Sequence, residues 1–385
     1  MKNIDPKVEE AIDTLDIAGV ARRRLLSGAG LVSATAAASA LLAACSSGNK
    51  SSSSTASAAA GGGSGKSGNF PETPKWKFVF VNHVTTNPFF TPTQYGAQDA
   101  CALLGCSFQW TGSKDSVVSE MVSSMNSAIS SKADGIAVAV VDKTAFGQPT
   151  DNALKQGIPV VSYNADGARG NPGTNRLAYI GQDLYLSGYQ LGTRIASLMS
   201  GGDAVGFIAT PGTLNIQPRI DGATDAIKAS KKPINFQSVA SGAELPKELT
   251  TIDAYVQGHP NLKGIFAVDA GSTENIGKVV QKYNLKQKGV VAGGFDLNPN
   301  TLSAIKAGNL DFTIDQQPYL QGFLPVLQLW FYKLSGGLVA PSDTNTGLLF
   351  VTKDNVDPYL TTQTRFEGST TAQKVLPRSG PIAHA

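Results

Sequence analysis

Histidine and cysteine are scarce in this sequence, with three of each among 385 residues. A metal site needs several His, Cys or carboxylate side chains at ligand spacing, and no such cluster occurs. Cys101 and Cys106 are too few for a closed zinc site, and they either form a disulfide outside the cell or remain buried thiols. The sequence therefore predicts no metal and no cofactor.

An excess of charge of one sign is also absent. Lys and Arg total 32 and Asp and Glu total 29, which gives a net charge of +3. No basic stripe with interleaved aromatic residues occurs, so a nucleic-acid partner is not expected. The length exceeds that of one ordinary core, and we expect two domains once the terminal segments are removed.

The N-terminus has the features of an export signal. Arg22 and Arg23 precede a stretch from Leu25 to Ala44 that is rich in Ala, Ser and Gly and ends in "LLAAC". This pattern is typical of a twin-arginine signal peptide, here residues 1–44, with a lipobox in which Cys45 receives a lipid. A membrane-spanning anchor is the alternative, but the stretch is poor in Leu, Ile and Phe. We expect a mature chain that begins at Cys45 and is lipid-anchored on the outer face of a bacterial cytoplasmic membrane or in a periplasm.

Residues 45–74 read as a lipidated cysteine followed by a Ser/Gly-rich linker. Within the linker, "AGGGSGKS" at 60–67 fits a relaxed phosphate-binding loop. That loop requires a strand before it and a helix after it, and neither is predicted here, so we interpret the segment as spacer.

From residue 76 the pattern alternates between strands and helices, which indicates parallel sheets covered by helices. Apolar runs predict strands at 77–81, 136–141, 159–163, 177–180, 204–209, 264–268, 289–295 and 312–314. The halves repeat one another: "KADGIAVAVVD" resembles "PNLKGIFAVDA", and "QGIPVVSYN" resembles "KGVVAGGFD". We infer two similarly wound α/β domains whose carboxyl strand edges face each other across a cleft, with Asn164 and Asp296 in corresponding places.

Neutral and acidic hydrogen-bonding residues follow these strands, together with the aromatic pair of "NPFF". There is no glycine-rich turn after the first strand, so a nucleotide site is not predicted. Polar groups beside an aromatic ring suit an uncharged, hydroxyl-rich ligand with one apolar face, which is a sugar. One ring of Phe89 and Phe90 would pack inward while the other lies beneath the sugar; the alternative is that both belong to the core.

Two aspartates at strand ends, Asp269 and Asp296, are candidates because other residues can cap the helices that follow them. Asn298 and Pro299 can begin the helix after Asp296, and Ser272 or Thr273 can cap the one after Asp269, which would leave both carboxylates free for a ligand.

Arg219 lies in a first helical turn, where a cation opposes the helix dipole. This placement suggests a binding role, with a solvated surface arginine as the alternative. Gln316 ends the last predicted strand, and its alternative role is that of a turn residue.

At these residues the chain resembles substrate-binding lipoproteins of sugar ABC transporters, of the ribose- and galactose-binding type I class. The resemblance runs from about Lys75 to Leu360 and rests on "NPFF", "GIPVVSYN", "AYIGQD", "GFD" and "TIDQQPYLQG". It implies a sugar site made of His83, Asn87, Phe89, Phe90, Asn164, Arg219, Asp269, Asp296 and Gln316. Ribose binders follow the acid at the Asn164 position with Arg, whereas Ala165 and Asp166 follow here, which argues against ribose itself. The segments "AYIGQD" and "QPYLQGFLPVLQL" look closer to members that bind hexoses or other monosaccharides, so the expected ligand is a hexose, a pentose or a related polyol.

The resemblance also implies the domain organisation. Crossings near Gly181, Gln317 and Asn345 would form a three-crossing hinge between a domain of 75–181 plus 318–345 and one of 182–317 plus 346–370, with a tail at 371–385. Hinge closure on the sugar would precede docking of a monomer on a membrane permease with its cytoplasmic ATPase.

Such a protein is not an enzyme. The alternatives are a receptor for a furanosyl autoinducer and an exported glycosidase that uses Asp269 and Asp296 as an acid/base pair. A sugar-responsive repressor would need an N-terminal DNA-binding motif in place of the export signal.

Overall fold

The computed structural model describes residues 71–167, 171–337, 341–361 and 365–368. The predicted signal peptide, Cys45, nearly all of the linker and the tail lie outside the described residues. In the described ranges, no helix combines the length and the apolar character that crossing a bilayer requires.

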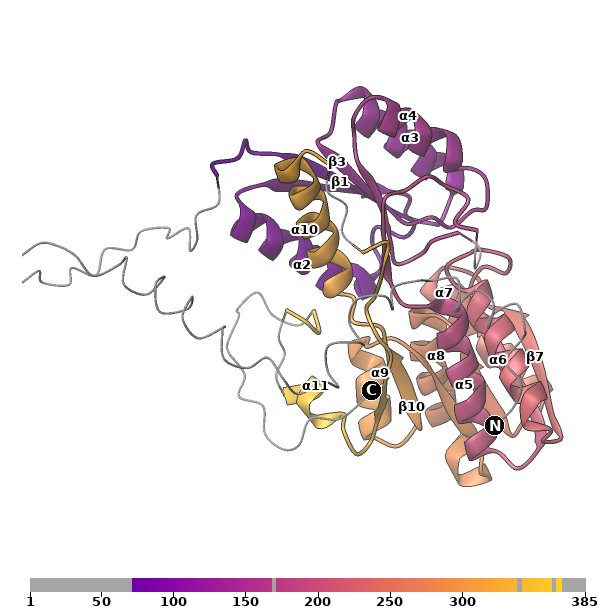
Figure 1. Cartoon of the computed structure of the whole chain (residues 1–385). Coiled ribbons are helices and arrows are strands. Elements are labelled where there is room, and N and C mark those ends of the chain that lie inside the picture. Colours follow the sequence, from indigo (N-terminus) through magenta and orange to yellow (C-terminus); the bar gives the residue numbers. More distant parts are fainter. Residues whose placement is uncertain (1–70, 168–170, 338–340, 362–364, 369–385) are drawn as a thin grey trace, which may run out of the picture. The chain divides into compact units, whose positions relative to one another are not determined.

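Two six-stranded sheets form the framework (Figure 1). The first has the order β11-β5-β4-β3-β1-β2, and all its pairs are parallel. Its strands are β1 (Lys77–Asn82), β2 (Ser107–Gly112), β3 (Gly135–Val138), β4 (Val160–Tyr163), β5 (Tyr179–Gly181) and β11 (Asp343–Asn345). Five of the six residues of β1 are buried, as expected for a strand with helices on both faces of its sheet.

The second sheet repeats this winding, with the order β12-β10-β9-β8-β6-β7. Its strands are β6 (Gly202–Ile208), β7 (Ile234–Ala240), β8 (Gly264–Ala267), β9 (Val291–Phe295), β10 (Phe312–Asp315) and β12 (Leu349–Thr352). Only the outermost pairing differs, because β12 runs antiparallel to β10. The predicted fold class, two similarly wound parallel-sheet α/β domains, is confirmed.

The first domain contains a helix that comes from far along the chain. Its helical elements are η1 (Pro88–Phe90), α2 (Thr91–Leu104), α3 (Val118–Ser130), α4 (Gly147–Lys155) and α10 (Leu320–Ser335). Helices α2 and α10 pack side by side (Figure 1). Their contact depends on glycine, since a Cβ atom on Gly322 would lie 1.8 Å from the carbonyl oxygen of Thr93.

The second domain has a similar close helix contact. Its helical elements are α5 (Leu184–Leu198), α6 (Gln217–Ser230), α7 (Leu245–Gly258), α8 (Ala270–Lys282), η2 (Leu285–Lys288), α9 (Pro299–Lys306) and α11 (Asp357–Thr361). Helices α5 and α6 pack against each other, and a Cβ atom on Gly188 would lie 2.1 Å from the carbonyl oxygen of Arg219. This close packing holds the first turn of α6 against α5.

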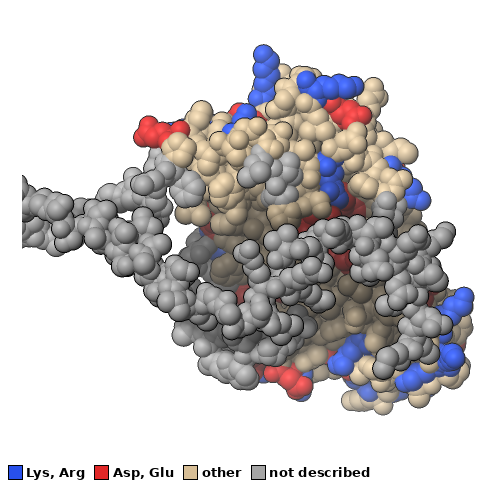
Figure 2. Space-filling view, in the orientation of Figure 1, with Lys and Arg blue, Asp and Glu red and all other residues tan. Residues whose placement is uncertain are grey.

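The chain crosses between the domains three times, which confirms the three-crossing hinge. It leaves the first sheet after β5 and enters α5, which packs on α6 of the second domain. It returns after β10 into α10, and it crosses again between β11 and β12. On the face shown in Figure 2, Lys and Arg lie at several separate places with acidic side chains among them.

Candidate ligand-binding site

Asn164 and Asp296 occupy equivalent positions, directly after β4 and β9. Both have a left-handed backbone, with φ of 61° and 76°, which Asn and Asp adopt more readily than most residues. The amide of Asn164 donates to the carbonyl of Ile180 at 3.1 Å, and that of Asp296 donates to Ile314 at 2.8 Å. Both side chains are buried at the carboxyl edges of their sheets.

Contacts between the domains bring these two edges together. The amide of Leu214, in the loop before α6, donates to the carbonyl of Val141 at 3.0 Å. In the same loop, Nδ2 of Asn215 lies 3.3 Å from Nε2 of His83, which follows β1. The elements that carry the predicted site residues therefore face each other, as the sequence indicated.

Arg219 lies in the first turn of α6, as predicted, and it is only 3% exposed. Its Nη1 donates to the carbonyl of Val268 at 2.9 Å and its Nη2 to Oε1 of Gln182 at 3.1 Å. The guanidinium carbon lies 4.1 Å from the ring centroid of Phe295. Burial lowers the pKa of Arg219, while the Asp296 carboxylate acts in the opposite direction. A solvated surface arginine is thereby excluded.

The Asp296 side chain does not cap α9 but accepts a hydrogen bond from a side-chain amide. Its Oδ1 accepts a hydrogen bond from Nε2 of Gln316 at 2.7 Å. Helix α9 begins at Pro299 with Asn298 in the N-cap position, as expected, although the Asn298 side chain donates to Glu274 instead of capping. Burial raises the pKa of Asp296 to about 6, and Arg219 opposes that shift.

Asp269 corrects one prediction, because it is itself the N-cap of α8. Its Oδ1 accepts from the amide of Ser272 at 2.8 Å, and its Oδ2 accepts from the amide of Ala209 at 3.1 Å. We expected Ser272 or Thr273 to cap, but the helix begins at Ala270, which leaves both inside its first turn. Each Asp269 oxygen retains acceptor capacity after these bonds.

Glu248 on α7 is a second buried carboxyl group beside Asp269, and sequence reasoning missed it. Its side chain lies against the start of α8, where a Cβ atom on Gly271 would be 2.2 Å from its Oε2. Burial, followed by the charge of Asp269 and a hydrogen bond to it, raises the pKa of Glu248 to about 9. The Glu248 carboxyl is therefore protonated at neutral pH and donates to the Asp269 carboxylate.

This arrangement predicts a loss of stability at alkaline pH. A pKa raised on folding, here for Glu248, gives stability that is complete below the unfolded value near 4.5 and is lost as the pH rises through about 9. The ligand-free protein should lose about 2 kcal/mol between pH 7 and 9 through this group. Denaturant titrations at both pH values measure it, and Glu248→Gln should remove most of the loss.

Glu274→Gln is the matched control for that experiment. Glu274 is also buried, but hydrogen bonds from Lys278, Asn300 and Asn298 outweigh burial and lower its pKa, so its replacement should leave the alkaline loss intact. The pKa values of Asp296 and Asp315 near 6, and of His83 near 4, place their effects below pH 7. An equally steep loss in Glu248→Gln would contradict the assignment.

The aromatic pair forms η1 and lies against His83. Phe89 is 8% exposed and Phe90 is 1% exposed, so both rings are buried in this structure. The Phe90 ring packs edge-on against His83 at 5.4 Å, against Phe89 at 4.7 Å, and near Trp110 at 5.9 Å. Asn87 is half-buried, and its Oδ1 accepts from the Phe89 amide at 3.0 Å.

Three buried side-chain atoms at these edges have no hydrogen-bond partner in the described part of the chain. They are Nδ1 of His83, Oδ1 of Asn215 and Nε of Arg219. Burial lowers the pKa of His83 to about 4, so its ring is neutral at pH 7. Leaving a buried polar atom unpaired costs about 1–3 kcal/mol, so three such atoms at facing strand edges mark a candidate place for a polar ligand.

Sequence reasoning did not identify Asn215, Gln182 or Gln321. Asn215 lies in the loop after β6, and Gln182 lies at the first crossing, where its Nε2 donates to the carbonyl of Gly347 at 3.1 Å. Gln321 connects Asn164 to Gln316, which are 3.0 and 3.1 Å from its side-chain amide. Gln182 and Gln321 lie within the segments "AYIGQD" and "TIDQQPYLQG", but only the tertiary structure shows the partners of these amides.

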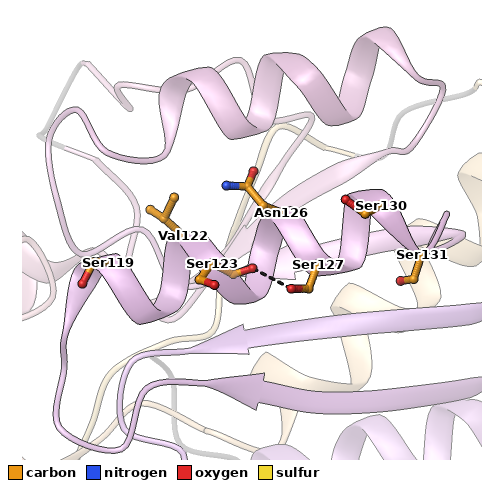
Figure 3. A pocket seen from close by; sticks show the side chains of 7 residues that line it. All are labelled: Ser119, Val122, Ser123, Asn126, Ser127, Ser130 and Ser131. Carbon is orange, nitrogen blue, oxygen red and sulfur yellow. Dashed lines mark hydrogen bonds between the residues drawn. The ribbon is translucent and has the colours of Figure 1, made fainter.

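Two hollows lie away from this site. One measures about 710 Å³ and lies along α3, where exposed serines, Asn126 and Val122 line it (Figure 3). Another hollow, of about 550 Å³, lies beside the hinge. Its lining includes Arg176 and Asp166, whose side chains form an ion pair at 2.6 Å. Neither hollow includes a predicted site residue.

Neither of the two described cysteines is among the candidate site residues. Cys101 and Cys106 are free thiols at the end of α2, and the amide of Cys106 donates to the carbonyl of Cys101 at 3.1 Å. Within the described ranges, no group of three or more His, Cys, Asp or Glu residues is arranged to hold a metal ion.

Comparison with known proteins gives consistent matches. The chain is 50% identical over 318 residues to the xylose/arabinose-binding protein XylF of Sulfolobus acidocaldarius, which covers 80% of this chain and 78% of that protein. It is 24% identical over 253 residues to the ribose import binding protein RbsB of Bacillus subtilis, which covers 65% of this chain and 80% of that one.

Solved structures agree. An ABC transporter solute-binding protein from Burkholderia graminis in complex with D-arabinose superposes with a TM-score of 0.68 at 26% identity, over 75% of this chain and 99% of that one. A carbohydrate transporter from Acidothermus cellulolyticus in complex with myo-inositol gives 0.67 at 25% identity, over 77% and 100%. Residues 78–336 match the family described as periplasmic binding protein domain. This chain therefore belongs to the periplasmic binding protein family and has its type I fold.

Proposed function

We propose that this protein captures a monosaccharide outside the cytoplasm and delivers it to an ABC permease, and that its ligand is a pentose of the xylose or arabinose type. The proposal rests first on the three unpaired buried atoms of His83, Asn215 and Arg219. The named ligands of the 50% identical relative, xylose and arabinose, support the pentose.

The available hydrogen-bonding groups suit a sugar. Arg219 Nε offers a donor, and His83 Nδ1 offers another when Nε2 accepts from Asn215. The second carboxylate oxygen of Asp296 and Oδ1 of Asn164 offer acceptors. Each sugar hydroxyl is both donor and acceptor, so a pentose can pair with this mixture without carrying charge, while its C–H face packs on a Phe89 or Phe90 ring.

Hinge closure completes the site. His83, Asn87, Phe89, Phe90 and Asn164 form a half-site on the first domain. The sugar then recruits the half-site on the second domain, made of Arg219, Asp269, Asp296 and Gln316. Because the ligand contacts both halves only in the closed form, it favours that form.

The remaining features of the proposal concern location and assembly. The closed monomer docks on the permease, which works with a cytoplasmic ATPase. After twin-arginine export, a lipid on Cys45 keeps the protein at the outer face of the membrane. The proposed domains are 75–181 with 318–345 and 182–317 with 346–370.

The protein acts without chemical conversion of its ligand. The relatives that the chain matches are named as binding proteins rather than as hydrolases. The two carboxylates of the alternative acid/base pair also have structural contacts, since Asp269 caps α8 and Asp296 accepts from Gln316.

A sugar panel tests the proposal on a chain that comprises residues 46–385. Isothermal titration and thermal shift are measured with D-xylose, L-arabinose, D-arabinose, D-ribose, D-glucose, D-fucose and myo-inositol. A pentose at 100 times its Kd should stabilise the protein by about 2.7 kcal/mol, while its deoxy analogue should have little effect. No response to any of these sugars would contradict the proposal and favour a furanosyl signal. Release of nitrophenol from a nitrophenyl xyloside would contradict the absence of enzymatic activity.

A further inference from the structure

Gln321 lies in the first turn of α10, directly after the second crossing, and it is fully buried. Its Oε1 accepts from Nδ2 of Asn164 at 3.0 Å. Its Nε2 lies 3.1 Å from both the carbonyl oxygen and Oε1 of Gln316, and 3.2 Å from Oγ1 of Thr346. One side chain thus connects the first-domain candidate Asn164 to the second and third crossings.

Asn164, Gln321, Gln316 and Asp296 form a row of side-chain hydrogen bonds in which each residue donates to the next. Asn164 donates to Gln321, Gln321 donates to Gln316, and Gln316 donates to Oδ1 of Asp296 at 2.7 Å. The carboxylate of Asp296 is an acceptor only, so it fixes the orientation of the last amide. Reversing any amide in the row would place two nitrogens or two oxygens face to face.

We propose that Gln321 is a positioning residue that sets the hydrogen-bond polarity of the sugar site. By accepting the amide hydrogen of Asn164, it leaves Oδ1 of Asn164 to face the ligand as an acceptor. Through Gln316 it holds Oδ1 of Asp296, so that Oδ2 is the oxygen left for the ligand. The two equivalent strand ends then both present acceptors to sugar hydroxyl hydrogens. This inference rests on the proposed function, because it takes Asn164 and Asp296 as ligand contacts.

The hinge supports the row mechanically. Oγ1 of Thr346 donates to the carbonyl of Gln316 at 2.8 Å, which ties the third crossing to the second. Thr346 and Gln316 are both buried, so neither bond is exposed to competing water. The residues to which Gln321 donates are therefore themselves fixed by buried hydrogen bonds.

Gln328 offers a matched control on the same helix. Its Nε2 donates to Oγ1 of Thr344 at 3.2 Å, so it also connects α10 to the strand that precedes the third crossing. It touches no candidate site residue in the described contacts. Gln321→Met and Gln328→Met each remove one amide without adding charge.

The expected result is a difference in ligand affinity rather than in stability alone. The Kd for the sugar found in the panel should rise by roughly 10–100-fold in Gln321→Met, as when the supports of other ligating groups are removed. It should stay within about twofold in Gln328→Met, although that variant also loses a hydrogen bond, which is partly buried. Equal Kd values for the two variants would overturn the inference.

Gln321→Glu gives a readout that a purely structural role would not produce. The ionised carboxylate can accept from Asn164 but cannot donate to Gln316, whereas the protonated acid can do both. Affinity relative to wild type should therefore recover as the pH falls from 8 to 5. The charged or titratable groups around these residues are Asp296, Asp269, Asp315, Tyr179, Arg219 and His83. They are present in both proteins, so the wild-type pH profile is the reference for their titration.

The two proposals fail in different ways. If the wild type binds none of the sugars, the proposed function is wrong and this inference fails with it. If the wild type binds a sugar, and Gln321→Glu shows neither weaker binding at pH 8 nor recovery at pH 5, the inference alone is wrong. The pH ratio tests the inference even if Gln321→Met fails to fold.

Discussion

Arg219→Met is expected to abolish measurable sugar binding and to lower the free energy of unfolding by about 3–5 kcal/mol. The substitution removes the only cation among the nine candidate site residues and leaves the buried Asp296 carboxylate without its nearby positive charge. It also removes the donors to Val268 and Gln182, although Met preserves packing over Phe295. Denaturant titration and calorimetry with the identified sugar measure the two effects.

Two further variants separate the loss of sugar binding from the loss of stability. Arg194→Met removes an arginine of the same domain whose guanidinium carbon lies 5.9 Å from the rings of Phe312 and Phe350, and it should cost stability without changing the Kd. Adding Asp296→Asn to Arg219→Met should restore part of the stability, because it removes the unpaired charge, but it should not restore binding. Wild-type affinity in Arg219→Met would refute the placement of this residue in the site.

Phe90→Ala is expected to cost about 3–5 kcal/mol of stability, whereas Phe89→Ala should act mainly on the Kd. Phe90 contacts the rings of His83, Phe89 and Trp110 and is almost completely buried. Phe89 retains more exposure, and Phe90 is its only ring contact among the described residues, so Phe89 is the better candidate for the face beneath the sugar.

Comparing the unfolding free energy with the Kd in both variants tests this division. Phe89→Tyr keeps an aromatic face and should bind within a few fold of wild type, whereas Phe89→Ala should bind at least about tenfold more weakly. An unchanged Kd in Phe89→Ala would mean that both rings belong only to the core.

The central strands could be predicted from the sequence because their burial on both faces requires continuous apolar runs. All eight predicted strands are present, although their ends differ by a few residues. Strands β2 and β7 were missed because they lie at sheet edges, where burial is partial and polar residues such as Gln109 and Gln237 fit. Strands β11 and β12 were missed as well, and they also lie at sheet edges, where Val351 alone among their residues is buried.

The placement of candidate residues could be predicted where it follows from strand ends. Asn164 and Asp296 end repeated segments, and parallel strands bring such ends to one edge, while their binding of a ligand stays a prediction. The N-cap role of Asp269 was missed because α8 begins at Ala270, three residues earlier than a cap at Ser272 would allow, and helix ends are the least certain part of a prediction from sequence. Gln321 lies far in the chain from Asn164, and nothing local to either residue indicates their contact.

The left-handed backbone after β4 and β9 limits what can replace Asn164 and Asp296. Apart from glycine, Asn and Asp are the residues that tolerate this conformation best, and they differ only in an amide nitrogen in place of an oxygen. Each strand end can therefore gain or lose a full negative charge without any movement of the main chain. New sugar preferences can thus arise by single-codon exchanges at these two positions. They are not independent, however, because the hydrogen bonds through Gln321 and Gln316 join them, and an Asp at position 164 would set two oxygens face to face unless Gln321 changed as well.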